Sequence, residues 1–142
     1  MLASLRVNIT MIERSPLIHL LLSDGMERAR LVGGEVGEVI SRMTLLHGDA
    51  KDLLRNLSPE VVLVDPMHPP RKNTALVKKE MRQIREIVGT DEDSFELMQA
   101  ALYCASNRVV LKWPQKADPM AGIRAPSHQI SGKSTRYDVF MI

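Results

Sequence analysis

The sequence has little cysteine, few aromatic residues, little net charge and no long hydrophobic run. Its single cysteine, Cys104, excludes an internal disulfide and a zinc site built from several cysteines. The apolar runs are much shorter than the ~20 residues of a membrane-spanning helix, and the first residues lack the pattern of a signal peptide. A cytoplasmic setting is therefore the default expectation. The net charge of +2 is too small to indicate a nucleic-acid partner, so the distribution of charge is more informative than its sum.

One stretch, residues 61–64 followed by Asp65, organises the rest of the chain. Its four consecutive aliphatic residues predict a strand buried on both faces, as in a parallel sheet that helices cover. Three prolines follow within the next six residues, and proline cannot continue a central strand. Asp65 is thus expected at the carboxyl end of a strand, where open α/β sheets bind their ligands. The alternative is an aspartate that only caps a turn.

Short apolar runs and helical periodicity alternate along the chain and predict an α/β fold. The predicted strands cover about 6–12, 43–47, 61–64, 108–113, 129–131 and 137–142. The predicted helices cover about 16–31, 49–57, 75–88 and 93–105. Strands that alternate with helices form a parallel, doubly wound sheet, and the last two strands predict an antiparallel hairpin at its edge. A length of 142 residues suits one domain.

Local signals set the expected ends and faces of the helices. Ser15 as N-cap and Pro16 at the first helical position begin the helix over 16–31. Gly33-Gly34 resembles half a phosphate loop, but it follows a helix, so we interpret it as helix termination. Asp93-Ser94-Phe95-Glu96 fits a capping box. The residues expected to face inward from the first helix are Leu17, Leu20, Leu21 and, as a further candidate, Met26.

Acidic residues follow three of the predicted strands: Glu13, Asp49 and Asp65. The carboxyl ends of parallel strands share one edge of a sheet, so these three side chains can line one pocket. An acid in this position can accept hydrogen bonds from both ribose hydroxyls, which suits Glu13, and Asp49 could reach an adenine amino group. The alternative for each acid is a helix cap. Three acids at successive strand ends favour a nucleoside ligand.

Four stretches of the sequence carry a resemblance to a known family: MIERSP at 11–16, LHGD at 46–49, VDPMHP at 64–69 and ALVKKEMR at 75–82. Here the chain resembles the RsmJ family, bacterial enzymes that methylate the exocyclic N2 amine of a guanine in small-subunit ribosomal RNA. The resemblance covers nearly the whole chain, and the run LVKKEMR is specific to that family. It implies a Rossmann-like class I methyltransferase sheet, S-adenosyl-L-methionine as cofactor, and small-subunit ribosomal RNA or the 30S subunit as partner.

The resemblance also implies cofactor-binding residues. Glu13 and Arg14 are expected to hold the ribose side of the cofactor, and Asp49 and Ala50 to lie against the adenine. Asp65 is expected in the pocket shared by cofactor and target. No metal is required.

The catalytic residues implied by the resemblance are Asp65, Pro66 and His68. A guanine amine is a poor nucleophile, and a carboxylate and a loop carbonyl that accept its two hydrogens would aim its nitrogen at the methyl group. Family members usually have an aromatic residue where His68 stands, to stack on the target base. Imidazole can stack too, and base stacking is worth ~1–3 kcal/mol. The alternative for His68 is a solvated loop residue.

The start of the chain also departs from the family's pattern. Family members open this domain with a strand and a glycine-rich loop that cradles the methionine part of the cofactor, whereas residues 1–4 match the end of the following helix. We therefore expect residues 1–142 to form a single, truncated methyltransferase domain that lacks the first strand. Such a chain would bind cofactor weakly, unless the strands over 6–12 and 61–64 pair directly and close the gap.

Basic residues after the proline loop are the candidate RNA contacts, because lysine and arginine neutralise phosphates; the alternative is a solvated helix face. They are Arg71, Lys72, Lys78, Lys79, Arg82 and Arg85. Two other functions stay open: a dinucleotide-dependent oxidoreductase with Glu13 on ribose, and a non-catalytic RNA-binding remnant. The Asp-Pro-Met-His-Pro loop has no role in hydride transfer and disfavours the first, whereas the missing glycine loop favours the second.

Overall fold

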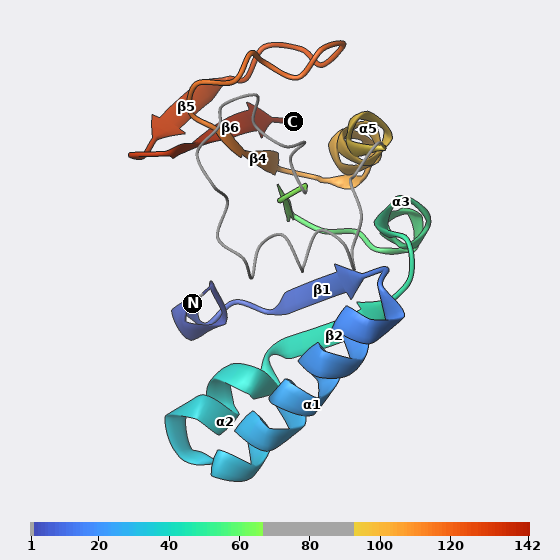
Figure 1. Ribbon diagram of the computed structural model, residues 1–142, viewed down its shortest axis with the longest axis vertical. Helices are drawn as coiled ribbons and strands as arrows, with labels where there is room; N and C mark the ends of the chain where they lie inside the picture. The colour runs from blue at the N-terminus through green and yellow to red at the C-terminus, as the bar shows by residue number, and fades with distance from the viewer. Residues whose placement is uncertain (1, 67–92) are drawn as a thin grey trace, which may run out of the picture. The chain divides into compact units, whose positions relative to one another are not determined.

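The computed structural model describes residues 2–66 and 93–142, and it divides into two compact units, Met1–Leu53 and Leu54–Ile142 (Figure 1). The predicted helix over 75–88 lies outside the described residues. Within the described part of the chain, no helix has both the length and the apolar composition needed to cross a membrane.

The N-terminal unit is built on two parallel strands, β1 (Ile9–Glu13) and β2 (Met43–His47). Their register pairs Ile9 with Met43 at one end and Glu13 with His47 at the other. The helical segments of this unit are η1 (Leu2–Leu5), α1 (Pro16–Val32), α2 (Gly34–Ser41) and α3 (Ala50–Leu53). The predicted strand over 43–47 is therefore confirmed, and the first strand is shorter at its start than predicted.

Helix α1 begins and ends where the sequence predicts. The Ser15 side chain accepts a hydrogen bond from the backbone N–H of Ile18, and Pro16 occupies the first helical position. At the other end, Gly33 has a positive φ of 69° and its N–H donates to the carbonyl of Arg30. Helix α2 follows at once, and the sequence reading missed it because two adjacent glycines indicate a loop.

The prediction for the inward face of α1 is confirmed for Met26 and wrong for the three leucines. Leu17, Leu20 and Leu21 are 47%, 64% and 58% exposed, whereas Met26 is buried. With about 100° between successive helical residues, Leu17 lies roughly 180° around the helix from Met26, and the other two leucines lie more than 100° from it. The stripe of leucines is thus on the wrong side of the helix to share the face that Met26 buries.

The C-terminal unit holds a four-stranded sheet in the order β3-β4-β6-β5 (Figure 1). Its strands are β3 (Val61–Val64), β4 (Arg108–Pro114), β5 (His128–Ser131) and β6 (Thr135–Met141), and its helical segments are η2 (Leu54–Asn56) and α5 (Ser94–Cys104). Strands β3 and β4 are parallel, and β6 pairs antiparallel with both β4 and β5. The predicted α/β class and the C-terminal antiparallel hairpin are confirmed.

One face of this sheet packs against α5 and forms the core. Val64, Val109 and Leu111 from the sheet are buried with Met98 and Ala101 from the helix. Because side chains of a strand alternate between its two faces, Val61 and Leu63 point to the opposite side, where they are 47% and 48% exposed. The expectation that the 61–64 strand is buried on both faces is therefore wrong.

Helix α5 begins near the predicted capping box, but the box is not formed. Asp93 is the N-cap, yet its side chain makes no capping hydrogen bond, and the helix is entered through its carbonyl, which accepts from the N–H of Leu97. The backbone of Asp93 has φ −102° and ψ 21° instead of the extended conformation typical of an N-cap. The sequence thus predicted the start of the helix correctly, but not the hydrogen bond of the N-cap side chain.

The described strands form two sheets. Strand β1 pairs with β2 in one sheet, and β3 pairs with β4 in the other.

Candidate active site

Two of the three predicted acids, Glu13 and Asp49, lie at the carboxyl edge of the β1–β2 sheet. Glu13 is the last residue of β1 and stands opposite His47, the last residue of β2. The backbone N–H of Gly48 donates to the carbonyl of Glu13 at 3.1 Å, which keeps the chain after β2 beside the end of β1. Parallel pairing therefore brings these two acids to one edge, as the sequence predicts.

The Glu13 carboxylate is oriented by the backbone of the next helix. Its Oε1 accepts a hydrogen bond from the N–H of Ser15 at 2.6 Å, while Ser15 itself caps α1. This contact is part-buried and fixes one oxygen of the carboxylate. A carboxylate has two oxygens and about four acceptor positions, so Oε2 can still accept hydrogen bonds from a ligand.

Asp49 is held in a similar way at the start of α3. Its Oδ1 accepts from the backbone N–H of Lys51 at 2.8 Å, and its Oδ2 lies 3.5 Å from the Lys51 ammonium. The helix-cap alternative is thus met for Asp49. Capping does not exclude ligand binding, because it engages one oxygen through the backbone and leaves the other beside the Lys51 ammonium, with acceptor positions to spare. Ala50 is the first residue of α3, and Arg14 is an exposed residue directly after Glu13.

Gly48 makes the tight turn between β2 and Asp49 possible. Its φ is +148°, a region that side chains rarely adopt, and an added Cβ would stand 3.1 Å from Cδ1 of Leu53. This glycine therefore lets Asp49 follow β2 closely.

The third acid, Asp65, belongs to the C-terminal unit and directly follows β3. Its Oδ2 accepts a hydrogen bond from the Lys112 ammonium at 2.7 Å. The side chains of Asp65 and Lys112 are 50% and 38% exposed, and Pro66 after them is buried. The sequence indicates that Lys112 ends a strand at this edge but not that it contacts Asp65, although the parallel register that pairs Val64 with Leu111 sets the next two residues side by side.

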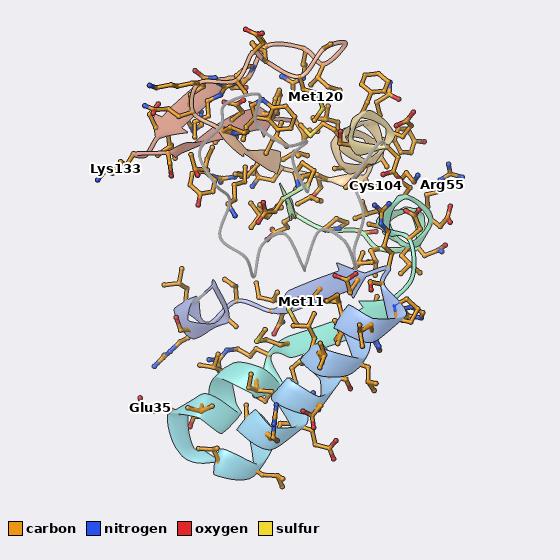
Figure 2. The ribbon with its side chains drawn as sticks, in the orientation of Figure 1. Met11, Glu35, Arg55, Cys104, Met120 and Lys133 are labelled. Carbon is orange, nitrogen blue, oxygen red and sulfur yellow. The ribbon has the colours of Figure 1, made fainter. Side chains whose placement is uncertain are left out.

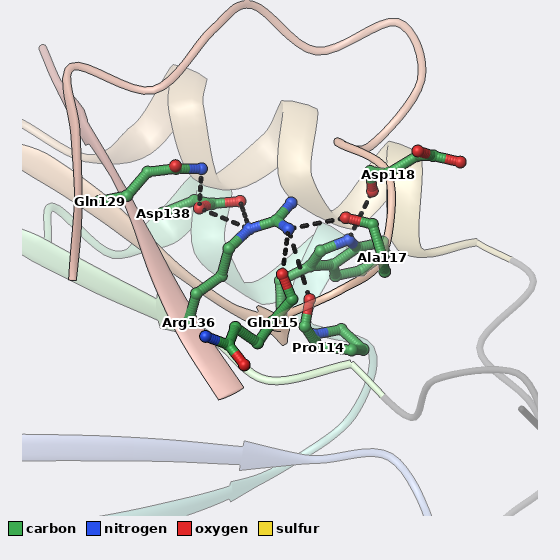
Figure 3. A network of polar contacts seen from close by, with 8 residues as sticks. Pro114, Gln115, Ala117, Asp118, Gln129, Arg136 and Asp138 are labelled. Atoms are coloured by element: carbon green, nitrogen blue, oxygen red, sulfur yellow. Dashed lines mark hydrogen bonds and ion pairs between the residues drawn. The ribbon is translucent and has the colours of Figure 1, made fainter. Parts of the chain in front are cut away.

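A buried ion pair holds the segment that follows β4 (Figure 3). Nε of Arg136 donates to both Asp138 oxygens at 3.0 and 3.1 Å, and these side chains are only 9% and 3% exposed. Nη1 of Arg136 donates to three main-chain carbonyls, that of Pro114 at the end of β4 (3.4 Å) and those of Gln115 (3.1 Å) and Ala117 (2.6 Å) after the strand. The side-chain amide of Gln129 also donates to Asp138. We call this set the Arg136 clamp; nothing in the sequence pattern indicated it.

Several predicted residues cannot be compared with the structure. His68 and the six basic residues proposed to contact RNA lie outside the described residues. They are Arg71, Lys72, Lys78, Lys79, Arg82 and Arg85. The convergence of Glu13, Asp49 and Asp65 on one pocket stays a prediction as well, because Asp65 belongs to a different unit from the other two.

A family model described as a putative SAM-dependent methyltransferase matches residues 1–142, and the chain belongs to this class of methyltransferases. It is 66% identical over 142 residues to ribosomal RNA small subunit methyltransferase J of Agrobacterium fabrum, and 66% identical over 141 residues to that of Brucella anthropi. The chain is thus a member of the ribosomal RNA small subunit methyltransferase J family. The resemblance found in the sequence is confirmed, and S-adenosylmethionine is the cofactor of the family.

The relatives also give the fold and the relative lengths. A crystal structure of a SAM-dependent methyltransferase from Neisseria gonorrhoeae superposes with a TM-score of 0.75 at 35% identity, over 98% of this chain and 57% of that one. The matches cover 68% of the Agrobacterium relative and 69% of the Brucella relative. The Rossmann-like methyltransferase fold is thereby confirmed, and the chain spans roughly two-thirds of the curated relatives.

Proposed function

We propose that this chain supplies the nucleoside-binding and amine-positioning part of an enzyme that methylates the exocyclic N2 of a guanine in small-subunit ribosomal RNA, in the cytoplasm. The observation that carries the proposal is the position of three acids at or just after the carboxyl ends of parallel strands: Glu13 is the last residue of β1, Asp49 follows β2 after Gly48, and Asp65 directly follows β3. The carboxyl ends of parallel strands are where α/β sheets bind nucleotides.

The residues at the end of β1 and β2 fit the nucleoside part of S-adenosylmethionine. Glu13 would accept ribose hydroxyl hydrogens through Oε2, because Ser15 holds its other oxygen. Asp49 would accept from the adenine amino group, with Ala50 against the ring and Arg14 beside the ribose. When bound, the cofactor supplies a methyl group on a positively charged sulfur. A carboxylate-rich edge suits that charge.

Asp65 and Pro66 are the residues proposed to hold the target amine. The lone pair of a guanine amine is delocalised into the ring, so the amine reacts only when it is well placed. A carboxylate oxygen of Asp65 and a carbonyl of the following loop would accept its two hydrogens and fix the direction of its nitrogen. Positioning of this kind can supply several kcal/mol without a covalent intermediate. His68 would stack on the base, and the basic residues at 71–85 would bind phosphates.

We propose further that residues 1–142 belong to one methyltransferase domain. A non-catalytic RNA-binding remnant is the competing outcome. The oxidoreductase alternative is set aside, because the family is one of methyltransferases.

The test is methyl transfer from radiolabelled S-adenosylmethionine to 30S subunits and to naked small-subunit RNA. Two proteins are compared: the chain itself, and the chain joined to the portion of the Agrobacterium relative that it does not match. We expect the joined protein to label N2 of guanine, and Asp65→Asn to lower its kcat about 100-fold. If the joined protein binds 30S subunits but transfers no methyl group, the remnant interpretation replaces this one.

A further inference from the structure

We propose that Lys112 is the positioning residue for Asp65: it binds one carboxylate oxygen and thereby points the other at the target amine. The inference rests on the proposed function of Asp65 and assigns a role to a residue that the sequence pattern left without one.

The geometry of the pair is the first argument. The Lys112 ammonium meets Oδ2 of Asp65 at 2.7 Å, the length of a strong charge-assisted hydrogen bond. No hydrogen bond to Oδ1 of Asp65 is found among the described residues. The side chain of Asp65 is 50% exposed, so its free oxygen can be reached from outside. Within the described part of the chain, one oxygen is thus held by Lys112 and the other accepts no hydrogen bond, which is the arrangement that a positioned acceptor needs.

The second argument is that Lys112 is itself well placed. It lies inside β4 and pairs with Tyr137 of the antiparallel strand β6, and the residue before it, Leu111, pairs with Val64 of the parallel strand β3. Two residues further on, the Arg136 clamp fixes the carbonyl of Pro114 (Figure 3). Asp65, in contrast, follows the last residue of β3, where the ladder with β4 has ended. A side chain from the rigid strand therefore orients a side chain at the end of its neighbour.

Stability does not account for this pair. Both side chains are more than a third exposed, and ion pairs that exposed contribute little to the free energy of folding. The orientation of the Asp65 carboxylate, in contrast, does depend on this pair. A carboxylate that rotates about χ1 spends only part of its time facing the substrate. Holding it in one rotamer raises the fraction of productive encounters without new contacts to the substrate.

The kinetic test uses the joined protein described above, with Lys112→Met, Lys112→Arg and the control Lys133→Met at the β5–β6 hairpin (Figure 2). Lys112→Met should lower kcat about 10- to 100-fold with KM for RNA and cofactor unchanged within about twofold, since a small misplacement can cost that much. Lys112→Arg should recover most of the rate, and Lys133→Met should match the unchanged protein. In addition, Asp65→Asn/Lys112→Met should be no slower than Asp65→Asn alone.

The kinetic results separate this role from RNA binding. If Lys112→Met instead raises KM for RNA and lowers the dependence of binding on salt, Lys112 contacts phosphate and the positioning role is wrong. A double variant that is much slower than Asp65→Asn would also contradict it, because Lys112 would then act without Asp65.

A second measurement does not depend on activity. In the chain itself, the three-bond couplings of the Asp65 β-protons report its χ1 by NMR. We expect one rotamer in the unchanged chain and in Lys133→Met, and averaged rotamers in Lys112→Met. Averaged couplings in the unchanged chain would overturn the inference. The two measurements can also disagree. If Asp65 has one rotamer that is lost in Lys112→Met, but the joined protein transfers no methyl group, the inference stands and the proposed function is wrong.

Discussion

The two units use the same kinds of elements and bury very different amounts of apolar surface. Among the described residues, the N-terminal unit fully buries only Ala3 and Met26 of its apolar side chains. The C-terminal unit buries a larger set, from its sheet, from η2, and from α5 and the residue after it. Its members are Leu54, Val64, Met98, Ala101, Ala105, Val109, Leu111, Val139 and Phe140.

The difference follows from sheet size. A sheet of two strands has little surface on which to pack a helix and is marginal on its own, whereas four strands with a helix on one face can enclose side chains. The N-terminal unit therefore holds Glu13 and Asp49 mainly by local hydrogen bonds, such as those from the N–H groups of Ser15 and Lys51. The C-terminal unit holds Asp65 on a packed scaffold. We expect amides of β2 to exchange with solvent faster than those of β4.

The largest expected change in stability comes from removing the Arg136 clamp, which holds the better-packed C-terminal unit together. Arg136→Met leaves the Asp138 carboxylate buried without its partner and should lower the free energy of unfolding of the C-terminal unit by about 3–5 kcal/mol. Urea unfolding, detected by hydrogen exchange at the amides of β4, measures this loss of stability. The exposed Arg55→Met, in the same unit (Figure 2), is the control and should change stability by less than ~0.5 kcal/mol.

The double variant Arg136→Met/Asp138→Leu tests the reason for that loss. Replacing both charges by apolar side chains removes the lone buried carboxylate, so it should recover much of the stability. If the double variant is as unstable as Arg136→Met, the loss comes from the carbonyls of residues 114, 115 and 117, and not from the unpaired acid.

A matched pair of leucines sharpens the comparison. Leu111 is 1% exposed in the C-terminal unit, and its change to alanine should cost about 2–5 kcal/mol through lost contacts and a cavity. Leu20 is 64% exposed on α1, and the same change there should stay within about 0.5 kcal/mol. Denaturant unfolding of both variants measures the contrast. Equal losses would mean that Leu20 is covered in solution and that the two units are packed alike.

The smallest expected effect is in the N-terminal unit. Gly48→Ala places a side chain at φ +148° and near Leu53, and strained backbone of this kind costs about 1–3 kcal/mol. Because the turn carries Asp49, exchange at β2 amides should rise while exchange at β4 stays the same. Gly37→Ala, inside α2 with 3.7 Å to the nearest atom, is the control and should stabilise the unit slightly. A neutral Gly48→Ala would show that the turn adapts without cost.

Local signals in the sequence predicted most of the elements, and long-range pairing explains what they missed. Ser15-Pro16 marked the start of α1 correctly, since a cap depends on residues three positions apart. The leucines of α1 were predicted to face inward, and this prediction was wrong. Leu17 and its neighbours form an apolar stripe, but a stripe alone does not show which side of the helix packs against the rest of the unit. Glu13, Asp49 and Asp65 were placed correctly at strand ends. Lys112 was assigned no role, because its contact with Asp65 depends on which strands are neighbours.

In the segment after β4, the Arg136 side chain donates hydrogen bonds only to main-chain oxygens. The side chains of Gln115 and Lys116, which are exposed, therefore take no part in holding that segment in place. Natural variation or protein engineering can change the chemistry of this turn at those two positions while its path stays the same. The segment is thus a place where new surface properties can be introduced without disturbing Lys112, which lies three residues before Gln115.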